Sequence, residues 1–248
     1  MVVQHQIALL SIPWMLGIVS SIVMILFIYG LVAATPARYR ERVSILLGMI
    51  ILAEVASSHV YLSTVLRTWN LVDSLPLHAC RLSVIVSGIT LLTKSQISYE
   101  CSAYLGLPGG LNAILTPQLN QGIDPWMVFD FYFLHSMVIV VPILMTQFDS
   151  SVPRPHAVPY MFATANLAAM VVFPLNYVLD ANYMYLMHKP IADNPFFVGT
   201  WPYYILGLEV IVLLHLLLMD LFFRVGFCSG LRNLAAALRS IKMSRRQI

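Results

Sequence analysis

Seven apolar stretches, each close to the length of a membrane-spanning helix, constrain the fold of this chain more than any other feature of its sequence. About 20 apolar residues carry a helix across the hydrocarbon core of a bilayer. The backbone there must satisfy its own hydrogen bonds, as a helix does. The composition agrees, because 59% of the residues are hydrophobic and only 10% are charged. The stretches cover residues 8–34, 43–66, 75–93, 99–117, 126–148, 157–179 and 201–223.

These stretches predict an all-α protein, a polytopic membrane bundle of seven transmembrane helices that forms a single domain over residues 1–228. With the N-terminus outside, the outer loops contain only Arg67 and Lys189, whereas the inner loops and the tail contain eleven lysines and arginines. Because positive charge favours the cytoplasmic side, we expect the N-terminus outside and the C-terminus in the cytoplasm. Residues 229–248 predict a basic amphipathic tail on the inner membrane surface. This tail is too short to indicate a nucleic-acid partner.

The fourth stretch is interrupted by Pro108-Gly109-Gly110. Proline removes a backbone donor, and paired glycines let a helix bend or approach a neighbour closely. We therefore expect the fourth helix to be kinked or broken at this point. A half-helix that starts near Gly109 would point free N–H groups at an anion. A packing kink without a ligand is the alternative.

The segment Leu75-Pro76-Leu77-His78-Ala79-Cys80-Arg81 places an imidazole, a thiol and a guanidinium at the start of the third span. A charge at the centre of a spanning helix costs about 2.5–3.5 kcal/mol, so such groups usually face an interior cavity. The predicted topology puts more polar groups in the same outer half of the bilayer, and a shared depth predicts one polar cavity. The alternative is that these groups form separate hydrogen bonds between helices or reach the membrane surface. The further groups are Glu54, His59, Asp130, His135, Asn182 and Tyr183, with Lys189 in the adjoining loop.

Cys80 is the candidate nucleophile of this set, although a buried cysteine can also be a small apolar side chain. A thiol needs a base or a positive field to ionise, and Arg81 provides positive charge. On a helix His78 would face away from Cys80, so we expect the base from another helix, with His135 favoured over His59. These histidines and Cys80 could also be zinc ligands, but no HxxxH, CxxC or HExxH spacing is present. We predict no metal and no cofactor.

Several motifs resemble those of a known family. Over about residues 40 to 220 the chain resembles the YwaF-like bacterial integral membrane proteins, which are distantly similar to the transmembrane protein 164 acyltransferases. The resemblance implies a location in the bacterial cytoplasmic membrane. The motifs are Leu75-Pro76-Leu77-His78-x-Cys80-Arg81, Gly106-Leu107-Pro108-Gly109-Gly110 with Leu115-Thr116-Pro117, Phe133-Leu134-His135, Asn182-Tyr183-Met184 and Trp201-Pro202-Tyr203.

This resemblance implies an enzyme that moves a fatty acyl chain between phospholipids with a membrane-embedded cysteine and histidine. Cys80 matches the nucleophile position and His135 the histidine position. Ala79 and Gln118 depart from the family pattern, where a leucine and often an acid are expected. Neither departure falls on a residue with a catalytic role.

We therefore expect a lipid acyltransferase or transacylase that acts on membrane phospholipids. Arg81 and His78 would hold the headgroup phosphate. Backbone N–H groups of Gly109 and Gly110, or the side chain of Asn112, would stabilise the oxyanion.

The residues alone leave open whether the protein is an enzyme. A carrier or receptor for a small polar or lipidic solute would use the same cavity, with Glu54, Asp130 and Glu209 as its ionisable groups. A purely structural membrane protein is a third interpretation. The absence of a lysine for a Schiff base in the last span argues against a retinal-binding protein. The oligomeric state is not defined by the sequence.

Overall fold

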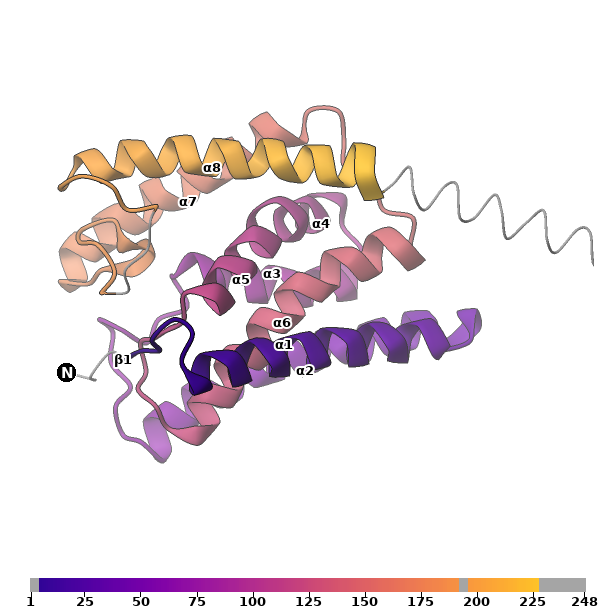
Figure 1. Cartoon of the computed structure of the whole chain (residues 1–248), viewed down its shortest axis with the longest axis horizontal. Coiled ribbons are helices and arrows are strands. Elements are labelled where there is room, and N and C mark those ends of the chain that lie inside the picture. The colour runs from indigo at the N-terminus through magenta and orange to yellow at the C-terminus, as the bar shows by residue number, and fades with distance from the viewer. Residues whose placement is uncertain (1–4, 192–195, 228–248) are drawn as a thin grey trace, which may run out of the picture.

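The computed structural model describes residues 5–191 and 196–227 and shows an all-α membrane protein with seven helical passes. Successive passes run in alternating directions through the bundle (Figure 1). Two short strands, β1 (His5–Gln6) and β2 (Gln118–Leu119), pair in an antiparallel arrangement. The helices are α1 (Ile12–Ala34), α2 (Ala37–Thr64), α3 (Ala79–Thr93), α4 (Gln96–Cys101), the π-helical η1 (Ser102–Gly106), α5 (Leu107–Leu115), α6 (Pro125–Phe148), α7 (Ala157–Leu179), the 3₁₀ turn η2 (Tyr183–Tyr185), α8 (Tyr203–Leu221) and the π-helical η3 (Phe222–Phe227).

Five helices of the described chain are long and apolar enough to cross a membrane: α1, α2, α6, α7 and α8 with its extension to Arg224. The third pass, α3, has only 15 residues and begins at Ala79 rather than at Leu75 as predicted. Leu75–Leu77 form a turn in which the Leu77 N–H donates to the Leu75 carbonyl, and His78 has an extended backbone as the N-cap residue. The predicted orientation in the membrane stays a prediction, and the predicted tail at 229–248 lies outside the described residues.

The fourth pass is one continuous helix made of α4, η1 and α5. Gly106 and Leu107 keep right-handed helical dihedral angles, so the chain does not break at Pro108. The irregularity is the wider π turn at Ser102–Gly106, just before this proline, and such turns inside α-helices are frequent at functional sites. Gly110 allows α5 to approach α6 closely, because a Cβ at this position would lie 3.2 Å from the carbonyl oxygen of His135.

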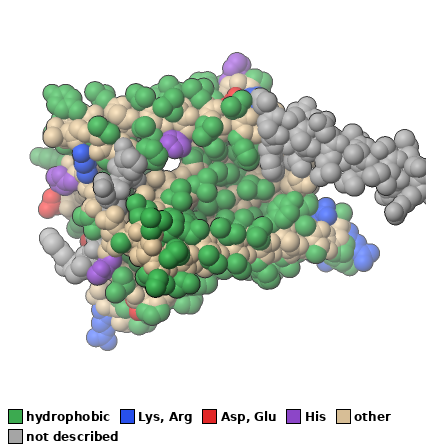
Figure 2. All heavy atoms as spheres, viewed as in Figure 1, with side chains coloured by type: hydrophobic (Ala, Val, Ile, Leu, Met, Phe, Trp, Pro, Cys, Tyr) green, Lys and Arg blue, Asp and Glu red, His purple; other side chains and the backbone are tan. Residues whose placement is uncertain are grey.

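Helix α6 is the centre of the bundle and is buried along most of its length. Leu134, Met137 and Val141 on this helix are at most 1% exposed and pack with Val84 and Tyr104 in the main core. The outward faces of α1, α7 and α8 instead expose large apolar side chains, which cover much of the surface in Figure 2. A surface this apolar fits contact with lipid chains rather than water.

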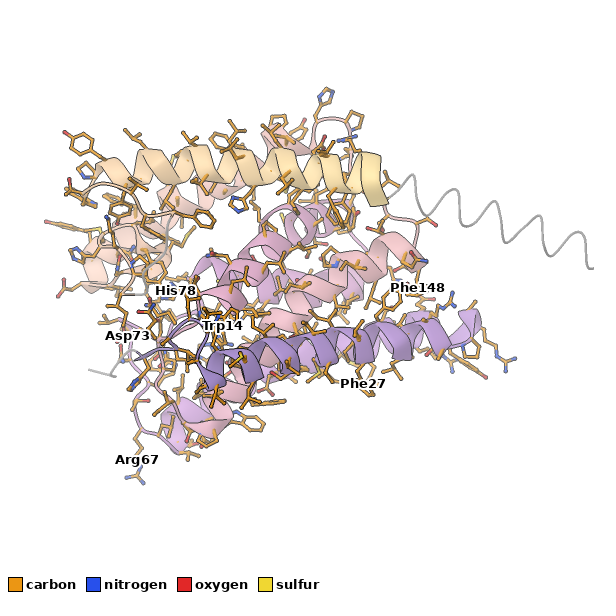
Figure 3. The ribbon with its side chains drawn as sticks, in the orientation of Figure 1. Trp14, Phe27, Arg67, Asp73, His78 and Phe148 are labelled. Atoms are coloured by element: carbon orange, nitrogen blue, oxygen red, sulfur yellow. The ribbon has the colours of Figure 1, made fainter. Side chains whose placement is uncertain are left out.

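Helices α7 and α8 form a separate layer that contacts the rest of the bundle mainly through α4 and η1 (Figure 1). Figure 3 labels Phe148 at one end of the molecule and His78 with Asp73 at the other; we call these the Phe148 end and the His78 end. A polar network ties the layers together at the Phe148 end. It consists of Tyr104, which donates to Asp220 (2.6 Å), the Arg224–Asp220 ion pair, an Arg224 bond to the Arg154 carbonyl, and the Arg154–Glu100 ion pair (2.7 Å).

Candidate active site in the interhelical cavity

A cavity of about 640 Å³ lies between the α7–α8 layer and the rest of the bundle. Figure 2 shows the molecule hollowed between these two layers. The cavity reaches from the His78 end, where loops and helix ends surround it, along the facing sides of α6 and α8. Eight predicted site residues line it: His59, His78, Cys80, Arg81, Gly109, Asn112, Asp130 and His135. Five predicted site residues are not part of the lining: Glu54, Gly110, Asn182, Tyr183 and Lys189.

Cys80 is the second residue of α3, and its half-buried side chain carries a free thiol. The first intrahelical hydrogen bond of α3 runs from the Leu82 N–H to the His78 carbonyl (3.0 Å). The backbone N–H groups before it lie at the start of a helix, where no intrahelical acceptor exists. Helix starts stabilise negative charge through these groups. The thiol therefore lies next to backbone donors that favour an anion.

His135 lies on α6 and is only 8% exposed. Its Nδ1 is 2.6 Å from the Phe131 carbonyl oxygen, which can only accept, so Nδ1 carries the proton. The other ring nitrogen, Nε2, is buried and has no hydrogen-bond partner among the described residues. A neutral imidazole with a proton on Nδ1 has its lone pair on Nε2. His135 is therefore held in the tautomer of a general base, with its basic atom unoccupied.

Arg81 and Asp130 form an ion pair on the cavity wall. Arg81 Nη2 and Nη1 donate to Asp130 Oδ2 (2.5 Å) and Oδ1 (3.2 Å), and the Ser58 hydroxyl donates to the same carboxylate (2.8 Å). Asp130 is 1% exposed, whereas 26% of the Arg81 side chain is exposed. The carboxylate thus orients the guanidinium, whose remaining N–H groups have no acceptor among the described residues.

Glu54 and His59 on α2 differ in their relation to the cavity. The Nδ1 of His59 accepts a hydrogen bond from the Trp69 indole (3.1 Å), and the ring lines the cavity. Glu54 is outside the lining; one carboxylate oxygen accepts from Ser57 (3.2 Å), and the other is buried without a partner among the described residues. No group of three or more His, Cys, Asp and Glu side chains in the described chain is arranged to hold a metal ion.

The loop between α7 and α8 closes the His78 end of the cavity. The Met184 N–H donates to His78 Nδ1 (3.3 Å), and the Tyr183 hydroxyl donates to the Leu71 carbonyl (2.7 Å). The side chain of Asn182 bonds the backbone of His188 (2.8 Å) within the loop, and Lys189 lies 6.0 Å from the ring of Tyr204. Asn182 thus bonds within this loop, Tyr183 bonds to the segment between α2 and α3, and Lys189 lies near α8. The substrate contacts predicted for these three side chains stay predictions.

The TMEM164 family model matches residues 2–220 of the chain. The chain belongs to the TMEM164 family. The match extends well before residue 40, where the motif resemblance was expected to begin, and covers all seven helical passes. The more specific resemblance to YwaF-like proteins stays a prediction. No curated protein and no solved structure matches the chain.

One cavity residue of this TMEM164-family protein was missed from the sequence. The hydroxyl of Tyr185 accepts hydrogen bonds from the side-chain amides of Gln118 (3.1 Å) and Asn120 (3.2 Å), and the ring packs 5.3 Å from His78. Burial raises the pKa of Tyr185 to about 12, so this phenol is neutral at pH 7. The aromatic run at 183–185 is typical of a membrane-interface belt, and only the fold shows that Tyr185 faces inward.

Proposed function

We propose that the protein is a membrane lipid acyltransferase that uses Cys80 as nucleophile and His135 as base. The TMEM164 family is associated with membrane lipid acyltransferase activity. The observation that carries the proposal is the tautomer of His135. An unpartnered buried Nε2 costs free energy of folding, so its presence points to a catalytic role, and His135 lines the same cavity as the Cys80 thiol.

The reaction proceeds in two steps. His135 Nε2 takes the thiol proton, and the Cys80 sulfur attacks the ester carbonyl carbon of a phospholipid. The carbon–oxygen ester bond breaks, the proton passes from His135 to the leaving oxygen, and a lysophospholipid is released from a Cys80 thioester. In the second step His135 removes the proton from the hydroxyl of an acceptor lysophospholipid. That oxygen attacks the thioester, and the sulfur leaves and regains its proton.

The start of α3 supports the oxyanion of both steps. The tetrahedral intermediate carries its negative charge beside the attacking sulfur, next to the free N–H groups of this helix start. The Tyr185 hydroxyl accepts two hydrogen bonds and keeps its own proton to donate. Gly109 and Gly110, expected in this role, lie inside a continuous helix, so their amides are not at a helix start. Asn112 lines the cavity and remains a second side-chain donor.

The positive charge near the site suits a phosphate headgroup. Arg81 is held in place by Asp130 and lines the cavity. Guanidinium groups bind phosphate oxygens through parallel hydrogen bonds. His78, which lines the same end, is the second headgroup contact. We place the His78 end at the outer surface of the membrane, in line with the charge distribution of the loops.

The test is an acyl-transfer assay in liposomes that contain an isotope-labelled diacyl phospholipid and an unlabelled lysophospholipid. We expect Cys80→Ser to abolish label transfer. Cys101→Ser is the matched control, because Cys101 is the other half-buried free thiol in the described chain, and it should retain transfer. Equal transfer by wild type and Cys80→Ser would refute the cysteine mechanism. No transfer by wild type across several headgroups would instead favour the carrier, with Asp130 as the residue to change.

A further inference from the structure

The cavity has a polar part and an apolar part. The polar part, at the His78 end, holds the groups described above. The apolar part continues between the two layers, and its lining includes Leu105 and Leu134 on one side and Ala165, Ala168, Leu208 and Val212 on the other. We call these six residues and the space between them the apolar arm. Nothing in the two reaction steps requires this space.

The spacing of the arm residues matches two facing helix sides. Ala165 and Ala168 are three residues apart on α7, and Leu208 and Val212 are four apart on α8, so each pair shares one side of its helix. The lining of α8 extends from Ile205 to Leu216 and is apolar except for Glu209 and His215. Eleven residues of helix rise by about 16 Å. The arm is thus elongated along α8, and it runs along the membrane normal if α8 spans the bilayer.

The surroundings of the arm indicate where an occupant comes from. Figure 2 shows the hollow between the layers open on the side of the bundle, and the outer face of α8 beside it exposes Leu206, Val210 and Leu213. An opening flanked by lipid-facing side chains admits groups from the bilayer. Glu209, the carboxylate on this stretch of α8, is hydrogen-bonded by Asn166 (3.0 Å).

We infer that the apolar arm binds one acyl chain of a diacyl phospholipid and that Ala168 limits the bulk of the chain it accepts; this deepens the proposed function and rests on it. Space lined by apolar side chains offers water few hydrogen-bond partners and is better filled by an apolar group. Methyl side chains at 165 and 168 leave room that larger residues would occupy. The ester of a chain lying in the arm is directed toward the polar part, where Cys80 lies.

The test measures binding without turnover, in Cys80→Ser protein, by native mass spectrometry. The probes are a long-chain and a short-chain diacyl phospholipid with the same headgroup, and a long-chain free fatty acid. We expect Ala168→Phe to weaken retention of the long-chain phospholipid at least about tenfold and to spare the short-chain one. Ala163→Phe is the matched control, since Ala163 lies on the exposed side of the same helix. It should change neither.

A second variant keeps the inference testable if Ala168→Phe does not fold. Val212→Ala widens the arm and should shift retention toward the long-chain phospholipid. Equal losses for both chain lengths, no change in either variant, or the same change with Ala163→Phe would overturn the inference. Retention of the fatty acid alone would also overturn it. If binding depends on chain length as expected but the wild-type protein transfers no acyl groups, the inference about the apolar arm holds and the proposed function is refuted.

Discussion

At the scale of single residues, one hydrogen bond, from His135 Nδ1 to the Phe131 carbonyl, determines which ring nitrogen of His135 carries the proton. We expect His135→Gln to lower acyl transfer about a hundredfold or more, because general base catalysis contributes on this order. The liposome assay measures the loss. His215 is a matched control, since its Nδ1 makes the same kind of bond to the Ile211 carbonyl (2.7 Å). Comparable losses in His135→Gln and His215→Gln would point to a general effect of removing a membrane histidine.

The Arg81–Asp130 pair should contribute to stability because the carboxylate is almost completely buried. Removing the charge with Asp130→Asn leaves the guanidinium without its partner, and we expect a loss of about 3 kcal/mol in the free energy of unfolding. Asp149→Asn removes the half-exposed Lys94–Asp149 pair (2.7 Å) and should cost at most about 1 kcal/mol. Denaturant unfolding in detergent measures both. Equal costs would mean that Asp130 is hydrated in the membrane.

Residue types and spacing predicted the site only in part. The costly groups of the third and fifth spans, His78, Cys80, Arg81 and His135, meet in one cavity, as a shared depth suggested. Which atoms pair was not predictable, because the Arg81–Asp130 contact depends on helix rotation. Tyr185 was missed for a similar reason, since the direction of a loop side chain is set by tertiary contacts. The substrate-binding roles expected of Asn182, Tyr183 and Lys189 stay predictions, although these side chains lie outside the cavity lining.

At the scale of elements, the close approach of α5 and α6 depends on Gly110. A leucine there would meet Ile139 and the His135 carbonyl, whereas a Cβ at Gly109 meets nothing within 4 Å. We expect Gly110→Leu to cost about 1–3 kcal/mol through overpacking. Gly109→Leu should change stability by no more than about 1 kcal/mol. Thermal unfolding in detergent compares the two, and a larger loss at Gly109 would contradict the packing of these helices.

The sequence predicted helix positions well where the length of the apolar stretch determines them. It predicted them poorly where turns, caps or a proline determine the ends of a helix. The long spans at α1, α6, α7 and α8 lie close to their predicted ranges. The third helix begins late because the turn at Leu75–Leu77 and the extended His78 come first. The fourth helix does not break at Pro108, and a π-helical segment at Ser102–Gly106 precedes the proline. The expected kink at Pro108-Gly109-Gly110 stays a prediction. Proline and glycine indicate where a helix can become irregular, but they do not predict which backbone conformation the chain adopts there.

At the scale of the whole molecule, the orientation in the membrane decides from which leaflet lipid reaches the cavity. The loop that contains Arg67 has few positive charges, which predicts that it lies outside the cell. We therefore expect an impermeant maleimide to label Arg67→Cys in intact cells. Ser150→Cys, in the loop between α6 and α7, should react only after permeabilisation. Both variants are made without the native cysteines. The reverse pattern would place the His78 end in the cytoplasm and contradict the proposed orientation.

The central claim, that Cys80 carries the acyl group during transfer, is tested most directly by mass spectrometry of the protein after incubation with labelled diacyl phospholipid and no acceptor. The account predicts one labelled acyl group, attached to the Cys80 peptide, released by hydroxylamine and lost on addition of lysophospholipid with formation of labelled product. Transfer of label with no acyl group ever found on Cys80, including at short times and low temperature, would contradict it.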